Sequence, residues 1–174
     1  MDALETILAR RSIRRYTDED VAVEIEERLI DAAFAAPSAN NSRPWHFVVV
    51  RRRETRARLS RVHPWSSMLC RSPLVIGVLG EVAAEWWIED CSAATENILL
   101  AATALGLGSV WVGVRDPGPE PGPEESSCLE ILGAPAGYRA LCLIGIGHPG
   151  EVKAPRTQRQ LAKISYERFG RRSR

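Results

Sequence analysis

The sequence predicts a single domain that contains both helices and strands. With 174 residues, of which 45% are hydrophobic and 26% charged, the chain is within the usual range for one domain and can bury a sizeable core. Four short apolar runs are typical of buried strands: 45–50, 73–80, 109–114 and 139–147. Segments with apolar residues at helical spacing separate them, and neither a repeat nor a second domain is evident.

The N-terminal part of the chain predicts two helices on either side of an arginine-rich bend. The first covers residues 3–10 and places its apolar side chains on one face (Leu4, Ile7 and Leu8). The second follows Thr17, which is predicted to cap it, and ends at Pro37. The bend reads RRSIRRY, residues 10–16. Three explanations are open for so much charge: a nucleic-acid patch, a solvated surface, or a pocket that binds one phosphate.

Three further helices are predicted in the middle of the chain. A surface helix covers 53–62, and the longest helix runs from Ala83 to Leu105, with Gly106 able to close it in a left-handed conformation. The stretch RDPGPEPGPEES, residues 115–126, predicts an irregular loop before a small helix over 127–132.

The charge is unevenly distributed although the net charge is only +1. Residues 62–150 carry three basic and ten acidic side chains, whereas residues 151–174 carry eight basic and two acidic ones. A nucleic-acid-binding domain is expected to be basic as a whole, so the acidic centre argues against such a partner, which stays an alternative. The tail has few large apolar residues. It either frays or docks across its own domain or a partner's, and the spacing of those residues favours docking.

The cysteines and histidines do not form a metal-binding pattern. Four cysteines are widely scattered without a CxxC pair, so we expect buried free thiols, and the three histidines are equally dispersed. No run of eighteen apolar residues exists and the N-terminus lacks the features of a secretory signal. We therefore expect no metal, no membrane span and a cytoplasmic location.

Three motifs carry information about ligands. The stretch PSANNSRPW, from Pro37, offers compact side chains that suit the edge of a polar heterocycle, and the glycines of GLGSVWVGV permit close approach to a flat ligand. Each could also be purely structural. The pattern GxGxxG at Gly145, Gly147 and Gly150 is rejected as a dinucleotide fingerprint, because no helix start and no following strand come after it.

Four segments in order resemble the nitroreductase family of FMN-dependent oxidoreductases. They are RRSIRRY, APSANNSRPWHF, DCSAATENILLAATALGLGSVWVG and IGIGHPGEVKAPRTQRQLAKISYERFG, and the resemblance runs from about Leu4 to Phe169. The match is to small members, because little chain lies between Val82 and Trp86, where larger relatives carry a helical excursion.

The resemblance implies an α+β fold with a mixed, mainly antiparallel sheet flanked by helices. It also implies one FMN-binding domain over residues 1–174 that forms a homodimer, in which the segment 151–174 crosses to the partner subunit. Two FMN molecules would lie at the interface, each contacted by both subunits.

The resemblance also implies which residues bind FMN. Arg10, Arg11 and Ser12 match phosphate contacts, Arg14 matches a basic residue beside the flavin pyrimidine, and Gly113 and Val114 match the strand end near flavin N5. Pro37, Ser38, Ala39 and Asn41 match contacts from the other subunit, and Arg156 matches a phosphate contact in the tail. No catalytic side chain is implied, because the flavin carries the chemistry.

Two positions depart from the family pattern. Gln158 stands where a second basic phosphate contact is expected, and Arg159 beside it could substitute. Arg43 stands where many relatives have glutamine, which adds a charge near the pocket.

The function implied is transfer of a hydride from NAD(P)H to flavin N5 and then to a small electron-poor acceptor, such as a nitroaromatic or a quinone, by a ping-pong mechanism. The alternatives are a specialised flavin chemistry such as reductive dehalogenation, and a flavin-binding protein without significant turnover.

Overall fold

Four strands form one antiparallel sheet in the order β1-β2-β4-β3. They are β1 (Trp45–Val50), β2 (Leu74–Glu81), β3 (Gly108–Gly113) and β4 (Tyr138–Gly147), in a computed structural model that describes residues 1–154 and 160–172. The central strands β2 and β4 are buried almost throughout, which is why they read as continuous apolar runs. All four predicted strands and the α+β class are confirmed.

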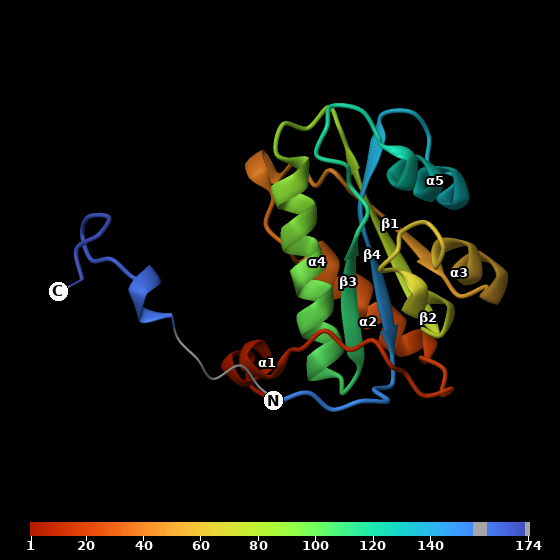
Figure 1. Ribbon diagram of the computed structural model, residues 1–174, viewed down its shortest axis with the longest axis horizontal. Helices are drawn as coiled ribbons and strands as arrows, with labels where there is room; N and C mark the ends of the chain where they lie inside the picture. Colours follow the sequence, from red (N-terminus) through yellow and green to blue (C-terminus); the bar gives the residue numbers. More distant parts are fainter. Residues whose placement is uncertain (155–159, 173–174) are drawn as a thin grey trace.

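Helices cover both faces of the sheet (Figure 1). On one face α2 (Val23–Phe34) and α4 (Trp87–Ala104) pack against Leu74, Ile76 and Val78 of β2. On the other face α3 (Arg53–Leu59), the 3₁₀ turn η2 (Ser67–Cys70) and α5 (Pro123–Leu132) pack against Val75 and Leu79. Alternate residues of one strand therefore serve two separate hydrophobic clusters, as the period of a strand requires.

Three predicted helix starts are wrong. Thr17 does not cap α2, whose N-cap is Ala22, because the Thr17 backbone N–H donates to the His148 carbonyl and keeps this stretch extended. The last helix begins at Pro123, not at residue 127, since proline is well suited to the first helical turn. The longest helix begins at Trp87, after a turn over 83–86, and Gly106 follows it with a φ of +78° as predicted.

The two ends of the chain expose apolar side chains. The helix α1 (Ala3–Ala9) is held by a capping box between Asp2 and Glu5, but its predicted apolar face is exposed: Leu4 is 72%, Ile7 52% and Leu8 65% accessible. In the tail, the 3₁₀ turn η3 (Leu161–Lys163) stands away from the sheet and helices (Figure 1). This part of the tail therefore stands apart from its own domain, whereas residues 151–154 lie against segment 10–16.

The glycines of the rejected GxGxxG pattern serve packing. A Cβ atom on Gly145 would lie 2.7 Å from Ser72 Oγ, one on Gly147 would lie 2.5 Å from Pro73, and one on Gly150 would meet the Tyr16 backbone at 3.1 Å. The pattern thus marks places where β4 and the chain after it approach neighbouring segments. Across the described ranges, no helix is both long and apolar enough to cross a bilayer.

Replacing Gly80 by alanine is expected to destabilise the fold. Gly80 lies in β2 beneath α4, and its added Cβ would sit 2.2 Å from the Trp87 ring and 3.0 Å from Cys91 Sγ. Overpacking of this kind costs about 1–3 kcal/mol. Urea unfolding should show a lower midpoint for Gly80→Ala, with Glu81→Ala, whose side chain is exposed, as the neighbouring control. Equal midpoints for Gly80→Ala and the unmodified chain would contradict the contact.

Candidate functional site

The arginine-rich segment 10–16 is extended and pairs with the start of β3. Ser12 and Ser109 form an isolated parallel bridge, and the Ile13 backbone N–H donates to the Ser109 carbonyl over 2.9 Å. Ile13 is buried, and its side chain fills the space above Gly108, where a Cβ atom would approach it to 2.7 Å. The segment is therefore fixed to the sheet by its backbone and by one apolar side chain.

The chain after β4 holds the same segment from the other side. The Glu151 carboxylate accepts the backbone N–H groups of Arg14 and Arg15 at 2.6 and 3.3 Å, and these hydrogen bonds, that of Arg14 first, lower the pKa of Glu151. Lys153 Nζ donates to the Ser12 carbonyl over 2.7 Å. The Tyr16 hydroxyl lies 2.7 Å from the Ile13 carbonyl, and burial raises its pKa.

Because the backbone of segment 10–16 makes these bonds, two of its four guanidinium groups, those of Arg14 and Arg15, make no side-chain bond in the described part of the chain. Arg10 Nε lies 3.3 Å from a half-exposed carboxylate, that of Glu96 on α4. Arg11 donates to the Ala154 carbonyl, Arg14 lines a cavity, and Arg15 is exposed. Arg14 is exposed as well, and the assignment of the individual arginines to phosphate and flavin stays a prediction.

The cavity beside Arg14 measures about 670 Å³ and also contains Gly113. Its other walls are mainly aromatic and apolar and come from residues 63–68, which run into η2, and from β3; they include His63, Trp65, Met68 and Trp111. A Cβ atom on Gly113 would have no neighbour closer than 3.8 Å, so the strand end is open to a ligand. Val114, also predicted for the site, is buried, and its N–H donates to the Leu141 carbonyl at 3.3 Å.

Sequence reasoning missed the wall formed by residues 63–68. The His63 carbonyl accepts from Ser66 Oγ at 2.6 Å, and His63 Nδ1 accepts the Trp65 N–H at 3.1 Å, so this stretch is a compact turn. Trp65 is 76% exposed. A short polar and aromatic turn has no distinctive sequence signal, and only the fold brings it beside Arg14.

The predicted loop over Pro37 to Arg43 adopts an unusual backbone. Asn40, Asn41 and Arg43 have φ values of 53°, 56° and 50°, in the left-handed region that side-chain-bearing residues rarely adopt. Such conformations persist only where surrounding contacts hold them, and they concentrate at functional sites.

Side-chain hydrogen bonds hold this loop in place. The Asp90 carboxylate, 5% exposed in the first turn of α4, accepts from the Ala39 N–H at 2.9 Å and from Ser42 Oγ at 3.3 Å. Ser38 Oγ accepts the Arg43 N–H at 3.0 Å, and Asn41 Oδ1 accepts from Arg43 Nε at 2.9 Å. Asp90 was not predicted from the sequence, because nothing marks one acid of a helix as a loop anchor.

Within one chain, the loop 37–43 and the segment 10–16 lie at opposite ends of α4 (Figure 1). The loop is bonded to Asp90 at the start of α4, whereas Ser12 pairs with Ser109, just after the helix has ended at Ala104. Eighteen helical residues span roughly 27 Å at 1.5 Å per residue. The two predicted parts of the site therefore do not meet within one chain.

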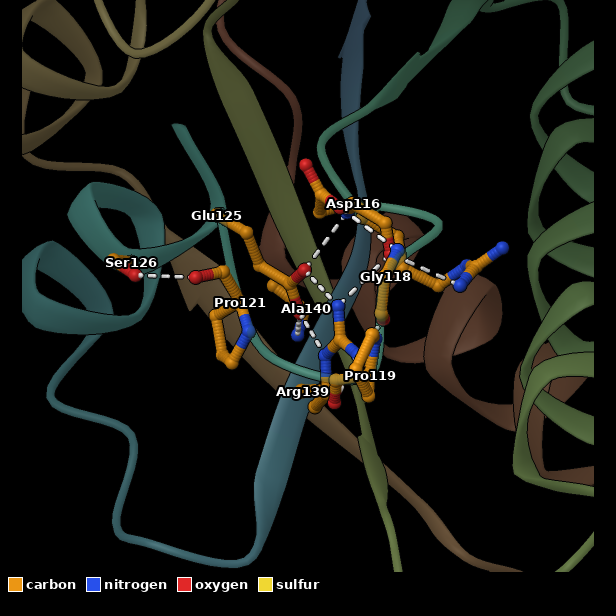
Figure 2. Close-up of polar contacts among 9 residues, drawn as sticks. Asp116, Gly118, Pro119, Pro121, Glu125, Ser126, Arg139 and Ala140 are labelled. Atoms are coloured by element: carbon orange, nitrogen blue, oxygen red, sulfur yellow. Dashed lines mark hydrogen bonds and ion pairs between the residues drawn. The ribbon is translucent and has the colours of Figure 1, made fainter. Parts of the chain in front are cut away.

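A buried ion pair fixes the loop that follows the Gly113 strand end (Figure 2). Glu125 is fully buried and Arg139 is 7% exposed, and two hydrogen bonds of 2.8 and 2.5 Å join them. Glu125 also accepts the N–H groups of Asp116 and Ala140, while Arg139 donates to the carbonyls of the loop (Asp116, Gly118 and Pro119). The hydrogen bonding of both charges is thus extensively satisfied.

Three further predictions concern the tail residues, the cysteines and a metal site. Arg156, Arg159 and Gln158 lie outside the described residues. All four cysteines are free, and three of them are buried, as predicted, whereas Cys70 is exposed. Among residues 1–154 and 160–172, no group of three or more His, Cys, Asp or Glu side chains could hold a metal ion.

The fold and the cavity together define an α+β domain that presents arginines and an open strand end to an aromatic-walled pocket. The family model described as the nitroreductase family matches residues 7–63 and 60–148, and the chain belongs to this family. A protein of Archaeoglobus fulgidus, provisionally named NADH dehydrogenase/NAD(P)H nitroreductase, is 41% identical over 158 residues, which cover 87% of this chain and 88% of the relative. A Methanothermobacter thermautotrophicus protein of the same name is 48% identical over 118 residues, and this match covers 66% of the chain and 62% of the relative.

Solved structures agree with this assignment. An FMN-dependent nitroreductase from Clostridium difficile superposes with a TM-score of 0.88 at 32% identity, covering 95% of this chain and 99% of that one. A protein of Parabacteroides distasonis, again provisionally named NADH dehydrogenase/NAD(P)H nitroreductase, gives a TM-score of 0.90 at 34% identity, over 96% and 98% of the two chains.

Removing the buried carboxylate of Glu125 is expected to destabilise the protein strongly, because Glu125→Ala leaves the Arg139 charge buried without its partner. The cost of such a change is about 3–5 kcal/mol. Glu124→Ala is the matched control, since Glu124 is half exposed and faces His63 at 3.6 Å, so its loss should cost no more than about 1 kcal/mol. Chemical denaturation measures both. If both variants lose the same free energy of unfolding, the buried ion pair stabilises the protein no more than the exposed carboxylate does.

Proposed function

We propose that this protein is an FMN-dependent NAD(P)H oxidoreductase that reduces small electron-poor acceptors such as nitroaromatics or quinones. The observation that carries the proposal is the convergence of Arg14 and Gly113 on one cavity, next to the backbone-anchored segment that contains Arg10 and Ser12. The names of the relatives support the cofactor and the reductant: one is an FMN reductase [NAD(P)H] of Bacillus subtilis, 27% identical over 179 residues.

The residues present fit FMN chemically. Guanidinium groups of Arg10 and Arg11 and the Ser12 hydroxyl provide the charged and neutral donors that a phosphate monoester requires. Ser109, which pairs with Ser12, has a buried Oγ without a hydrogen-bond partner in the described part of the chain, so a polar group is available at the same place. The aromatic and apolar walls of the cavity suit a flat ring system.

When bound, FMN supplies a ring that accepts a hydride from the nicotinamide and later gives the electrons to the acceptor, so that one site serves both half-reactions by ping-pong kinetics. The Arg14 guanidinium would stabilise negative charge on the pyrimidine side of this ring. The backbone at Gly113 and Val114 would orient the reactive side of the ring. No side chain of this protein needs to transfer a proton or form a covalent bond in this scheme.

We further propose that the active unit is a homodimer in which each FMN is contacted by both subunits. The separation of the loop 37–43 from the segment 10–16 supports this, because Pro37, Ser38, Ala39, Asn41 and Arg43 would then serve the partner's cavity. The exposed apolar side chains of α1 and of the tail, including Phe169, give the partner a surface to cover. Residues 151–174 would cross to the partner within one FMN-binding domain. A cytoplasmic location stays a prediction.

The colour of the purified protein tests the cofactor. We expect a yellow protein that releases FMN on denaturation, and a flavin absorbance that bleaches when NADH or NADPH is added without oxygen and returns on addition of a quinone or nitroaromatic. A colourless protein that cannot be reconstituted with FMN would reject the proposal. A yellow protein that neither nicotinamide bleaches would favour flavin binding without turnover, and bleaching without reoxidation by these acceptors would favour a more specialised flavin chemistry.

Replacing Arg10 by alanine is expected to weaken FMN retention by roughly 1.5–3 kcal/mol, the contribution of a hydrogen bond to a charged group. The dissociation constant should rise about ten- to a hundredfold, measured by flavin fluorescence during dilution or dialysis. Arg15→Ala is the matched control, because Arg15 lies in the same segment with an exposed side chain. Retention that is unchanged in Arg10→Ala would show that the phosphate is bound elsewhere.

A further inference from the structure

A second cavity, of about 590 Å³, lies between α3 and the end of η2. Three arginines line it, Arg53 and Arg56 from α3 and Arg71 from the residue after η2, together with the thiol-bearing Cys70 and a single acid, Asp18. None of the residues assigned to FMN contributes to this lining. The cavity is nevertheless close to the proposed FMN cavity, because Ser67 and Met68 line that one and η2 has only four residues.

The Arg56 guanidinium is held rigidly at the cavity wall. Its Nε donates to the Arg51 carbonyl at 3.1 Å, and its Nη1 donates to the carbonyls of Cys70, at 3.4 Å, and Ser72. Burial and the neighbouring charge of Arg53 lower the pKa of Arg56, although Asp20 partly opposes them. A positive charge is therefore fixed in a place where its neighbours do not fully compensate it.

The acids near this cavity are largely used elsewhere. Arg51 binds the carboxylates of Glu26 and Asp20 at 2.6 and 3.4 Å. In the described part of the chain, Arg53 and Arg71 take part in no hydrogen bond or ion pair through their side chains, and Asp18 is exposed and unpaired. The lining therefore has three guanidinium groups against one carboxylate.

The positive charges repel one another weakly, and a bound anion would remove this repulsion. Arg53 and Arg56 are three residues apart on one helix face, a spacing at which like charges repel. Guanidinium forks match the oxygens of a phosphate group, and they bind it in pairs with more specificity than a point charge can. We propose that this cavity is a second anion site that binds the dianionic phosphate of a phosphate monoester. This proposal does not rest on the proposed oxidoreductase function.

The four cysteines allow a local test of occupancy. Cys70 is exposed in the cavity, whereas burial raises the pKa of Cys91 and of Cys128 to about 12 and also raises that of Cys142. Iodoacetamide should therefore alkylate Cys70 first, and mass spectrometry can follow its rate in the protein as purified, with any bound flavin. We expect inorganic phosphate to slow alkylation several-fold in a saturable manner, and sodium chloride of equal ionic strength to have no such effect.

Variants connect this protection to the cavity. The double variant Arg53→Gln/Arg71→Gln should bind phosphate at least about tenfold more weakly, because two charge-assisted contacts are lost. Arg58→Gln is the matched control, since Arg58 lies on the same helix but lines a different cavity. If the double variant does not fold, the single variant Arg71→Gln replaces it in this test and should also bind phosphate more weakly. The proposed site would be rejected if chloride protected Cys70 from alkylation as well as phosphate does. It would also be rejected if Arg58→Gln lost this protection to the same extent as the double variant.

Two sources of the phosphate group are distinguished by the same variants. Adenosine 2′-monophosphate is the probe for the phosphate of NADPH, and inorganic phosphate is the probe for a small free ester. A KM for NADPH that rises in the double variant, with the KM for NADH unchanged, would identify the nicotinamide cofactor as the occupant. Unchanged KM values together with lost phosphate protection would identify a separate phosphate compound. The alkylation measurement needs no turnover, so it separates failure of this site from failure of the proposed function.

Discussion

The candidate site depends on one constraint: the segment 10–16 must be fixed firmly while its arginine side chains stay available. The protein meets this constraint with backbone bonds. Ile13 donates to Ser109 of β3, and the Glu151 carboxylate receives the N–H groups of Arg14 and Arg15 in place of their guanidinium groups. An ion pair between Glu151 and the Arg14 guanidinium would have neutralised the charge that is proposed to face the flavin pyrimidine. Anchoring by the backbone leaves that charge free at a fixed position.

The helix α4 organises the rest of the site along its length. Asp90 in its first turn holds the left-handed loop, Glu96 further along faces Arg10, and the helix ends shortly before β3 starts. Because the helix is straight and spans the sheet, the loop and the arginine segment are kept apart at its two ends. The same rigid element that positions both parts therefore prevents one chain from joining them, and this separation supports the proposal of a two-subunit site.

Much of the fold could be predicted from the sequence, because the strands and helices have clear periodic patterns. The four strands and the left-handed Gly106 follow from local chemistry, whereas the start of α2 does not: Thr17 is a good cap by type, but its N–H donates to His148 far along the chain. The site residues near Arg10 and Gly113 were found through motifs. The wall at residues 63–68 and the anchors Asp90 and Glu125 were not, because their roles arise from tertiary contacts that leave no local pattern.

The arginines show most clearly why composition alone is insufficient. Three environments occur in one chain: Arg139 is buried and satisfied by Glu125, Arg51 is shared between the carboxylates of Glu26 and Asp20, and Arg53 lines a cavity together with two other arginines and one acid. The net charge of +1 does not reveal these differences, because acidic and basic side chains balance over the whole chain but not around each arginine. Burial penalises a positive charge, so a partly buried guanidinium such as that of Arg56, beside the like charge of Arg53, marks a place where an external anion would lower the free energy. The distribution of unpaired arginines, more than their number, indicates where this protein binds its ligands.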